Sequence, residues 1–339
     1  MSHLKVVATV FGLCLLCSLL YVVVKQNTSV PSEQAPNSEE VESIPSRNTT
    51  EGSALVTGKH EEESRLLQDI QTQLSFGPRY SGMSGHTDVI EWITKELATS
   101  TWNVEKQEWV HTQHDGEEFS FVNIVSRFAP EKTNRIILGA HYDSRAHADQ
   151  DKNYGDAPVP GANDSASGVA VLIEVVRRLA QAEVQPNVGV DVVFFDAEEG
   201  DPRLPTAGNP WRPYGSEYFA HHVTDFYGGN LPEAGLIVDM VCDANLEFII
   251  EGTSHRDAKA NTERVWSIGH AMYPELFSYG EFVNIYDDHI SLNAVGIPST
   301  LLIDFTYPYW HTTRDTIDKC SAKNMEKVVE VVLAYVYSF

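Results

Sequence analysis

Three acidic residues stand close together where an apolar segment ends. In the stretch DVVFFDAEEGD, residues 191–201, the first five residues are mostly apolar and predict a buried strand, after which come Asp196, Glu198 and Glu199. Like charges this close repel one another and resist burial unless a cation lies among them. The pattern therefore predicts a cation site with one carboxylate left over for other chemistry.

Other segments supply further candidate ligands, which are His141, Asp164, Asp239 and His311. Alone, Asp164 is interpreted more simply as a helix N-cap, and His311 as a hydrogen-bonded structural histidine. Together with Glu199, the set offers two imidazoles and three carboxylates without a thiolate, which favours a Zn²⁺ site with open coordination positions. Glu198 is then free to move protons as a general acid and base.

Alternating apolar strands and helical stretches must position these residues. Strands are expected at residues 121–128, 135–143, 190–199, 235–243 and 299–305, and helices at 63–74, 87–100, 166–182 and 324–339. This order predicts an α/β fold with a mainly parallel, twisted central sheet that is covered by helices on both faces. Because ligands bind at the carboxyl ends of parallel strands, the candidate residues should converge at one edge of the sheet.

The first 60 residues differ in composition from the rest. An uncharged apolar run at residues 6–24 predicts a membrane-spanning signal-anchor within residues 1–25, with a cleaved signal as the alternative. Residues 26–60, rich in Ser, Thr, Glu and Pro, predict a disordered stalk, in which Asn27 and Asn48 stand in glycosylation sequons. Residues 61–339 are then the catalytic domain, which we expect on the lumenal or extracytoplasmic side, in a Golgi-type compartment or in the periplasm.

Composition limits the choice of partners. The formal net charge of -24 disfavours nucleic acid and anionic lipid headgroups as partners and attracts cations. With 42% hydrophobic residues, the chain can build a large core, and we expect a monomeric catalytic domain. Outside the apolar N-terminal run, only Cys242 and Cys320 are present, and they are interpreted as two buried thiols.

Seven ordered motifs then indicate a family. GAHYDSR, PGANDSASG, FFDAEEGD, YGSEYFA, LIVDMV, DDHIS and YWHTTRDT, spread over roughly residues 62–339, resemble the zinc aminopeptidases and the glutaminyl-peptide cyclotransferases that share their fold. The resemblance implies a zinc aminopeptidase-like α/β/α sandwich. GPRYSGMSG, the acidic pair in DDHI and Trp310 before the final histidine resemble the cyclase branch, as does an N-terminal anchor with a short stalk.

The cyclase resemblance also implies roles for individual residues, and a single Zn²⁺. Asp164, Glu199 and His311 would be the zinc ligands. Glu198 would move protons, with Asp239 and Asp287 as further catalytic carboxylates, and the substrate would be a peptide or protein with a free N-terminal glutamine. Trp310 would line its pocket. The chain departs from the cyclases in having no tryptophan closely after EEGD, and Trp211 would either supply this missing aromatic wall or anchor a surface loop.

Two alternatives stay open. In an aminopeptidase, His141 and Asp239 would complete a second zinc site bridged by Asp164, and Glu198 would activate water against the first peptide bond. Leu301 departs from the cyclases, many of which carry a histidine there. An inactive ectodomain that keeps the fold for binding is the third interpretation.

Asp287 and Asp288 are adjacent acidic residues with two interpretations. They either form a solvated loop or bind the amine of the substrate.

Overall fold

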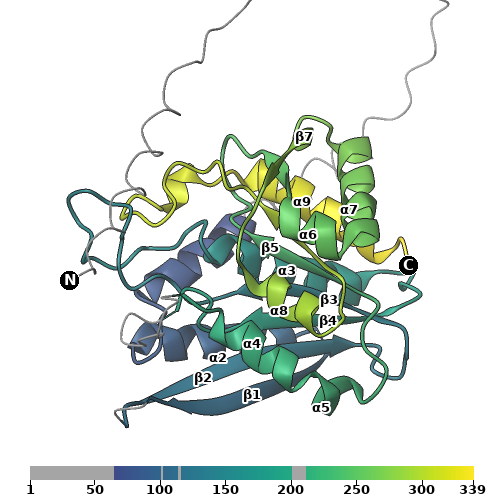
Figure 1. Cartoon of the computed structure of the whole chain (residues 1–339), viewed down its shortest axis with the longest axis horizontal. Helices are drawn as coiled ribbons and strands as arrows, with labels where there is room; N and C mark the ends of the chain where they lie inside the picture. Colours follow the sequence, from purple (N-terminus) through teal and green to yellow (C-terminus); the bar gives the residue numbers. More distant parts are fainter. Residues whose placement is uncertain (1–64, 101, 114–115, 201–210) are drawn as a thin grey trace, which may run out of the picture. The chain divides into compact units, whose positions relative to one another are not determined.

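The computed structural model describes residues 65–339 except 101, 114–115 and 201–210 (Figure 1). The predicted anchor at residues 1–25 and stalk at residues 26–60 lie outside the described residues. Among the described helices, none combines the length and the apolar character that crossing a bilayer requires. The described residues fall within the predicted catalytic domain at residues 61–339.

A six-stranded sheet forms the centre of this domain, with the strand order β1-β2-β4-β3-β5-β8. Its strands are β1 (Asn103–Thr112), β2 (Glu118–Phe128), β3 (Arg135–His141), β4 (Gly189–Phe195), β5 (Ala234–Asp239) and β8 (Ser299–Ile303). The four strands from β4 to β8 run parallel to one another, whereas β1 and β2 are antiparallel additions at one edge. The predicted α/β class with a mainly parallel sheet is confirmed.

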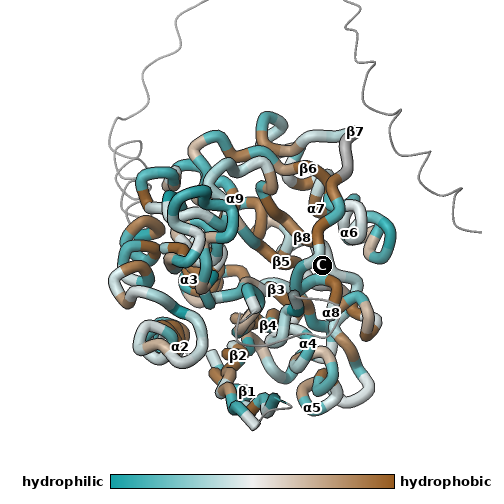
Figure 2. Tube along the Cα trace, turned by 60° about the vertical axis from the view of Figure 1, so that its left-hand side comes forward, coloured by the Kyte–Doolittle hydropathy of each residue, from teal (hydrophilic) through white to brown (hydrophobic). Residues whose placement is uncertain are grey.

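Helices cover both faces of the sheet. They are a helix at residues 65–75, α2 (Ser84–Ala98), α3 (Ala166–Gln181), α4 (Tyr214–His221), α5 (Val223–Tyr227), α6 (Gly252–Asp257), α7 (Lys259–Met272), α8 (Asp288–Ala294) and α9 (Ala322–Val336). Side chains from residues 65–75, α2, α3, α7 and α9 pack in one core on the first face, and those from α4, α5 and α8 pack in a second core on the other. Figure 2 shows the apolar strands between these two layers.

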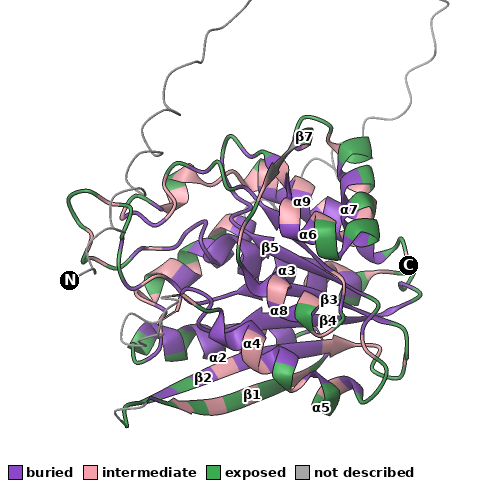
Figure 3. Ribbon diagram, viewed as in Figure 1, coloured by how far each residue is buried: buried purple, intermediate pink, exposed green. Residues whose placement is uncertain are grey.

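The parallel strands are mostly apolar because both of their faces are covered. All residues of β3, β4, β5 and β8 are buried, and along β3 Ile136 and Leu138 join one core while Ile137 joins the other. In contrast, β1 alternates exposed and half-buried residues at the edge of the sheet (Figure 3). A short second sheet pairs β6 (Phe248–Glu251) with β7 (Phe277–Val283) and lies beside α6 and α7.

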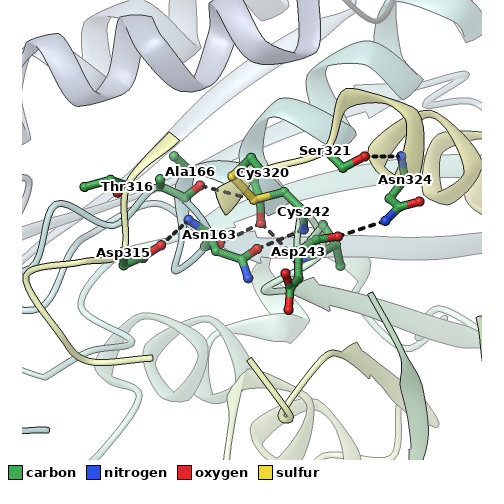
Figure 4. Close-up of a disulfide and its surroundings, with 12 residues drawn as sticks. Asn163, Ala166, Cys242, Asp243, Asp315, Thr316, Cys320, Ser321 and Asn324 are labelled. Carbon is green, nitrogen blue, oxygen red and sulfur yellow. Dashed lines mark hydrogen bonds between the residues drawn. A yellow bond between two sulfur atoms is a disulfide. The ribbon is translucent and has the colours of Figure 1, made fainter. Parts of the chain in front are cut away.

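The interpretation of the two domain cysteines as thiols is wrong. Cys242 and Cys320 form a disulfide with a Cα–Cα distance of 4.6 Å (Figure 4). Cys242 follows β5, and Cys320 precedes α9. The two segments meet through a β-bridge between Asp243 and Cys320 and a hydrogen bond from the Ser321 amide to the Cys242 carbonyl. Because 78 residues separate the two cysteines, only the folded topology brings them together.

Candidate active site and metal centre

Two groups of three potential ligands meet at the carboxyl ends of the parallel strands. Asp164, Glu199 and His311 form one triad, with His311 Nε2 lying 3.7 Å from Asp164 Oδ2 and 3.5 Å from Glu199 Oε2. His141, Asp164 and Asp239 form the other, with His141 Nε2 lying 3.2 Å from an oxygen of each carboxylate. The structure therefore brings together all five side chains that the sequence proposed as ligands, and Asp164 belongs to both triads.

Each ligand comes from a segment that follows one of the parallel strands. His141 and Asp239 are the last residues of β3 and β5, and Glu199 follows the end of β4. The loop that precedes α3 carries Asp164, and the segment after β8 carries His311. The strand order brings these five residues together at one edge of the sheet, as predicted. The simpler interpretation of Asp164 as an N-cap does not apply, because Ser165 occupies that position of α3.

The turn after β4 separates the three carboxylates of the opening motif. Asp196 points away from both triads: its carboxylate lies 2.8 Å from His86 Nε2 and accepts a hydrogen bond from the Val122 amide. Glu198 and Glu199 are aimed into the site, and their backbone amides donate to the two carboxylate oxygens of Asp143, each over 3.1 Å. Asp196 is therefore balanced by a histidine and does not belong to the cation site.

Three residues at the site have left-handed backbone conformations. Ala197, Met240 and His311 have φ angles of 51°, 47° and 54°. Such angles are uncommon for residues other than glycine and concentrate where surrounding contacts hold a functional segment in place. Ala197 directly precedes Glu198, and Met240 directly follows Asp239, so each of these conformations sets the direction in which a site residue leaves the sheet.

The donor set fits a divalent cation. Burial raises the pKa of Asp164 to about 7, and the adjacent carboxylate of Glu199 contributes to this rise. Within the described residues, Glu199 Oε1 is buried without a hydrogen-bond partner. Zinc bond lengths of about 2.0–2.1 Å at tetrahedral angles require ligand atoms roughly 3.3 Å apart. His311 Nε2 lies at similar distances, 3.5 Å from Glu199 Oε2 and 3.7 Å from Asp164 Oδ2. A cation would neutralise the crowded carboxylates, and Glu199 Oε1 offers it a further acceptor atom.

Glu198 lies beside the triads without belonging to either. Its Oε2 atom is 3.9 Å from His141 Nδ1. Burial raises the pKa of Glu198 well above its usual range; His141 opposes this shift, and the carboxylates of Asp287 and Glu199 reinforce it. A raised pKa makes a carboxyl group a better proton acceptor, which suits the role of a general acid and base.

A single cavity of about 310 Å³ joins Glu198 to the triads. Its lining includes the predicted residues Asp164, Glu198, Glu199, Asp239, Asp287, Trp211, Trp310 and His311. Trp310 stacks on His311 and contacts Phe305 edge to face, and Trp211 makes an edge-to-face contact with Tyr286. The cavity thus has aromatic side chains in its wall and carboxylates in its lining, which suits a small substrate group carrying a cationic amine.

The adjacent acidic residues Asp287 and Asp288 are buried and do not form a solvated loop. Asp287 is the N-cap of α8, and the carboxylate of Glu251 holds the segment before it. Glu251 accepts hydrogen bonds from the backbone amide of Ile285, over 3.1 Å, and from Nε2 of His289, over 3.0 Å. His289 is therefore a buried structural residue.

Sequence reasoning missed several residues of the site. Arg145 donates to Glu199 Oε2 over 2.8 Å, and Asp149 Oδ1 accepts a hydrogen bond from His311 Nδ1 over 2.9 Å. Asp315 accepts from the backbone amides of Asn163 and Asp164 and so fixes the loop of one ligand. These residues lie in polar loops without periodicity, although Arg145 stands inside the GAHYDSR motif, which could have drawn attention to it.

Comparisons with known proteins bear on this site. A model of peptidase family M28 matches residues 123–336. The glutaminyl-peptide cyclotransferase of Drosophila melanogaster is 27% identical over 287 residues, which cover 75% of this chain and 76% of that protein. The glutaminyl cyclase of Tannerella forsythia is similar in structure, with a TM-score of 0.74, 32% identity and coverage of 82% of this chain and 98% of that chain. A leucine aminopeptidase precursor from Bacteroides thetaiotaomicron has a TM-score of 0.74 and 30% identity, and covers 82% of this chain and 97% of that chain.

Proposed function

The chain belongs to peptidase family M28, and we infer that within this zinc-dependent family it is a glutaminyl-peptide cyclotransferase. It converts the N-terminal glutamine of a peptide or protein to pyroglutamate and releases ammonia. The observation that carries this function is that Glu198 and the triad of Asp164, Glu199 and His311 line one cavity walled by Trp310. A proton carrier, a metal site and an aromatic pocket then act on the same bound group.

One zinc ion, held by Asp164, Glu199 and His311, is the form that we propose for catalysis. Three protein ligands leave a coordination position open, as catalytic zinc sites require. When bound there, zinc supplies Lewis-acid polarisation of the substrate's γ-carboxamide. In this form, His141 is not a metal ligand. Its Nδ1 atom lies 3.9 Å from Glu198 Oε2, and its Nε2 atom lies 3.2 Å from Asp239 Oδ1.

Glu198 performs the proton transfer in the proposed reaction. The α-amine nitrogen of the substrate attacks the γ-carboxamide carbon, a C–N bond forms, and the bond to the departing nitrogen breaks. Glu198 takes the proton from the attacking amine and gives it to the departing nitrogen, which leaves as ammonia, so no water is consumed. Because nucleophile and electrophile belong to one residue, the protein mainly has to orient them. Asp239 and Asp287 line the same cavity and attract the cationic amino terminus of the substrate, which releases one proton to solvent before its nitrogen attacks.

Hydrolysis of N-terminal residues is the second candidate function, and it has less support. The triad of His141, Asp164 and Asp239 could hold a second zinc ion beside the first, as an aminopeptidase requires. The similarity to a leucine aminopeptidase precursor shows that the fold also occurs in a protein with that name. The similar curated proteins of Bos taurus, Drosophila melanogaster and Gloydius blomhoffii are named glutaminyl-peptide cyclotransferases, which favours cyclisation.

We also propose that the catalytic domain works outside the cytosol, attached to a membrane by the apolar segment at residues 6–24. The disulfide between Cys242 and Cys320 supports this location, because such bonds persist mainly in oxidising compartments. The monomeric state of the domain stays a prediction.

A paired peptide assay tests the function. The zinc-loaded protein is incubated with two peptides that differ only in beginning with Gln or with Leu, and the products are followed by mass. Loss of ammonia from the Gln peptide with unchanged chain length is the expected result. Release of free leucine from the other peptide without any cyclisation would favour the aminopeptidase instead.

A further inference from the structure

The loop at residues 145–159 connects β3 to the segment that carries Asp164, and it is held together by its own hydrogen bonds. The backbone amide of Val159 donates to the carbonyl of Arg145 over 3.0 Å, and the amide of Ala148 donates to the carbonyl of Ala157 over 2.8 Å. The two ends of the loop therefore meet, and the loop is a defined structural unit beside the metal site.

Three successive residues of this loop bind the turn that contains His311. Asp149 Oδ1 accepts a hydrogen bond from His311 Nδ1 over 2.9 Å. The backbone amide of Gln150 donates to the His311 carbonyl over 3.2 Å, and Asp151 Oδ2 accepts from the Thr313 hydroxyl over 2.6 Å. These contacts hold His311 in its left-handed backbone conformation, and the contact from Asp149 alone reaches its imidazole ring.

Arg145 connects this contact to a second ligand. Its Nη1 atom donates to Glu199 Oε2 over 2.8 Å, and its Nε and Nη2 atoms donate to the two oxygens of Asp149 over 3.1 and 2.8 Å. A continuous chain therefore runs from Glu199 through Arg145 and Asp149 to His311. A planar guanidinium can bind two carboxylates in this way, whereas a lysine ammonium lacks the fixed fork.

We propose that Asp149, held in place by Arg145, is a positioning residue that fixes the imidazole of His311 and thereby sets the metal affinity of the centre. The proposal rests on the proposed function, because it takes Glu199 and His311 to be metal ligands. Asp149 and Arg145 also line the cavity. The side-chain hydrogen bonds of Asp149 go to His311 and Arg145, so its effect on the metal centre passes through these two residues.

The physical reason lies in the two nitrogens of the imidazole. A carboxylate that accepts a hydrogen bond from Nδ1 keeps the proton on that nitrogen, so the lone pair of Nε2 faces Asp164 and Glu199. It also holds the ring in one orientation and makes it a stronger donor. Arg145 prevents the half-exposed Asp149 side chain from turning into solvent. Removing such an outer partner lowers metal affinity by about 10- to 100-fold in metal sites generally.

A matched pair of variants distinguishes positioning of the His311 ring from a contact that only holds the loop against the turn. Asp149→Ala removes the contact with the ring, and Asp151→Ala removes a contact from the same loop to the same turn without touching a ligand side chain. The zinc dissociation constant of each full-length protein is measured by competition with a chromophoric chelator. We expect it to rise at least about tenfold in Asp149→Ala, less in Asp149→Asn, and by less than about twofold in Asp151→Ala.

A second measurement tests the part of Arg145. Arg145→Lys keeps the positive charge but cannot bind Glu199 and Asp149 in the same geometry, so it should also weaken zinc binding. Arg145 donates to both Glu199 and Asp149, so the double variant Arg145→Lys with Asp149→Ala shows which contact matters. Zinc binding about as weak as in Asp149→Ala alone would support the proposed action through Asp149, and a further loss as large as that of Arg145→Lys alone would overturn it. The visible absorption of the Co²⁺-loaded proteins should change in Asp149→Ala and stay like the wild type in Asp151→Ala.

The outcomes keep this inference distinct from the proposed function. A protein that fails to cyclise Gln peptides, while Asp149→Ala still weakens zinc binding and Asp151→Ala does not, would remove the proposed function and support the inference. An active cyclase whose zinc affinity and Co²⁺ spectrum are unchanged by Asp149→Ala would overturn the inference alone. Equal losses in the Asp149 and Asp151 variants would also overturn it, because the loop would then act only as packing.

Discussion

The indole of Trp310 lies over the imidazole of His311, with ring centroids 3.7 Å apart and ring planes 23° from parallel. One face of the histidine therefore packs against the wall of the cavity, while Nδ1 faces Asp149 and Nε2 faces the other two members of its triad. The residue that walls the substrate pocket and the residue proposed to bind zinc are thus neighbours both in sequence and in space.

Replacing Trp310 by alanine should weaken the use of Gln peptides more than it weakens zinc binding. Loss of an aromatic contact of this size is worth roughly 1–2 kcal/mol, so we expect KM to rise about tenfold. Trp211→Ala, on a part of the wall that contacts Tyr286 and not a ligand, is the matched comparison. Steady-state kinetics and chelator competition measure the two effects, and an unchanged KM in Trp310→Ala would contradict the assigned pocket.

Glu198→Gln should abolish turnover while zinc stays bound. The amide cannot accept and return a proton, but it keeps the size of the side chain, and Glu198 is not a member of either triad. His311→Ala should instead lose metal, because it removes one of three ligands. Zinc content by elemental analysis and turnover of a Gln peptide are measured on both variants. Retained activity in Glu198→Gln would refute its role in proton transfer.

Glu251 should make the stability of the domain dependent on acidic pH. Burial opposes its ionisation, but the hydrogen bond and charge of His289, with amide donors from Ser254 and Thr253, lower its pKa from 4.5 to about 2. A lowered folded-state pKa means that the ionised carboxylate stabilises the fold above pH 4.5, and that this contribution disappears as the pH falls toward 2.

Glu251→Gln removes this ionisable carboxylate and therefore tests its contribution. The variant should lower the free energy of unfolding by about 3 kcal/mol at pH 7. Its difference from wild type should narrow as the pH falls from roughly 5 to 2. Denaturant unfolding at several pH values measures this difference. Glu247→Gln, an exposed acidic residue near the same small sheet, serves as the control, and a constant deficit of Glu251→Gln at all pH values would contradict the assignment.

Replacing both disulfide cysteines by serine should destabilise the domain. The bond closes a loop of 78 residues, and removing a native disulfide typically costs about 2–5 kcal/mol. The backbone amide of Cys242 donates to Oδ1 of Asn163, the residue before the proposed ligand Asp164. We expect a lower Tm in Cys242→Ser with Cys320→Ser, and the same decrease in wild type after reduction. An unchanged Tm would show that the bond contributes little.

The part of the fold that the sequence predicts well is the buried part. The strands β3, β4, β5 and β8 are mostly apolar because both of their faces are covered, and the candidate ligands lie at or after their carboxyl ends. One pattern therefore predicts both the fold class and the place of the site. Edge strand β1 was not predicted, because it has no buried face and its exposed and half-buried residues include several charged ones.

Contacts between distant loops could not be predicted in the same way. The pairing of Cys242 with Cys320 depends on how β5 and α9 lie together, and no spacing rule contains that information. The hydrogen bond between Asp149 and His311 joins residues 162 positions apart. Glu251 likewise stood at the end of a short strand without any sign that its carboxylate organises the segment before Asp287.

The two oxygens of Asp164 face opposite ways, Oδ1 toward His141 and Oδ2 toward His311. Any ion drawn to one side withdraws electron density from the oxygen on the other side, and two cations sharing one carboxylate also repel each other. The pair of triads should consequently fill in an anticooperative manner, with the second equivalent of metal bound more weakly than the first. The concentration of free metal in the compartment, more than the set of ligand side chains, then determines whether the protein carries a mononuclear or a dinuclear centre.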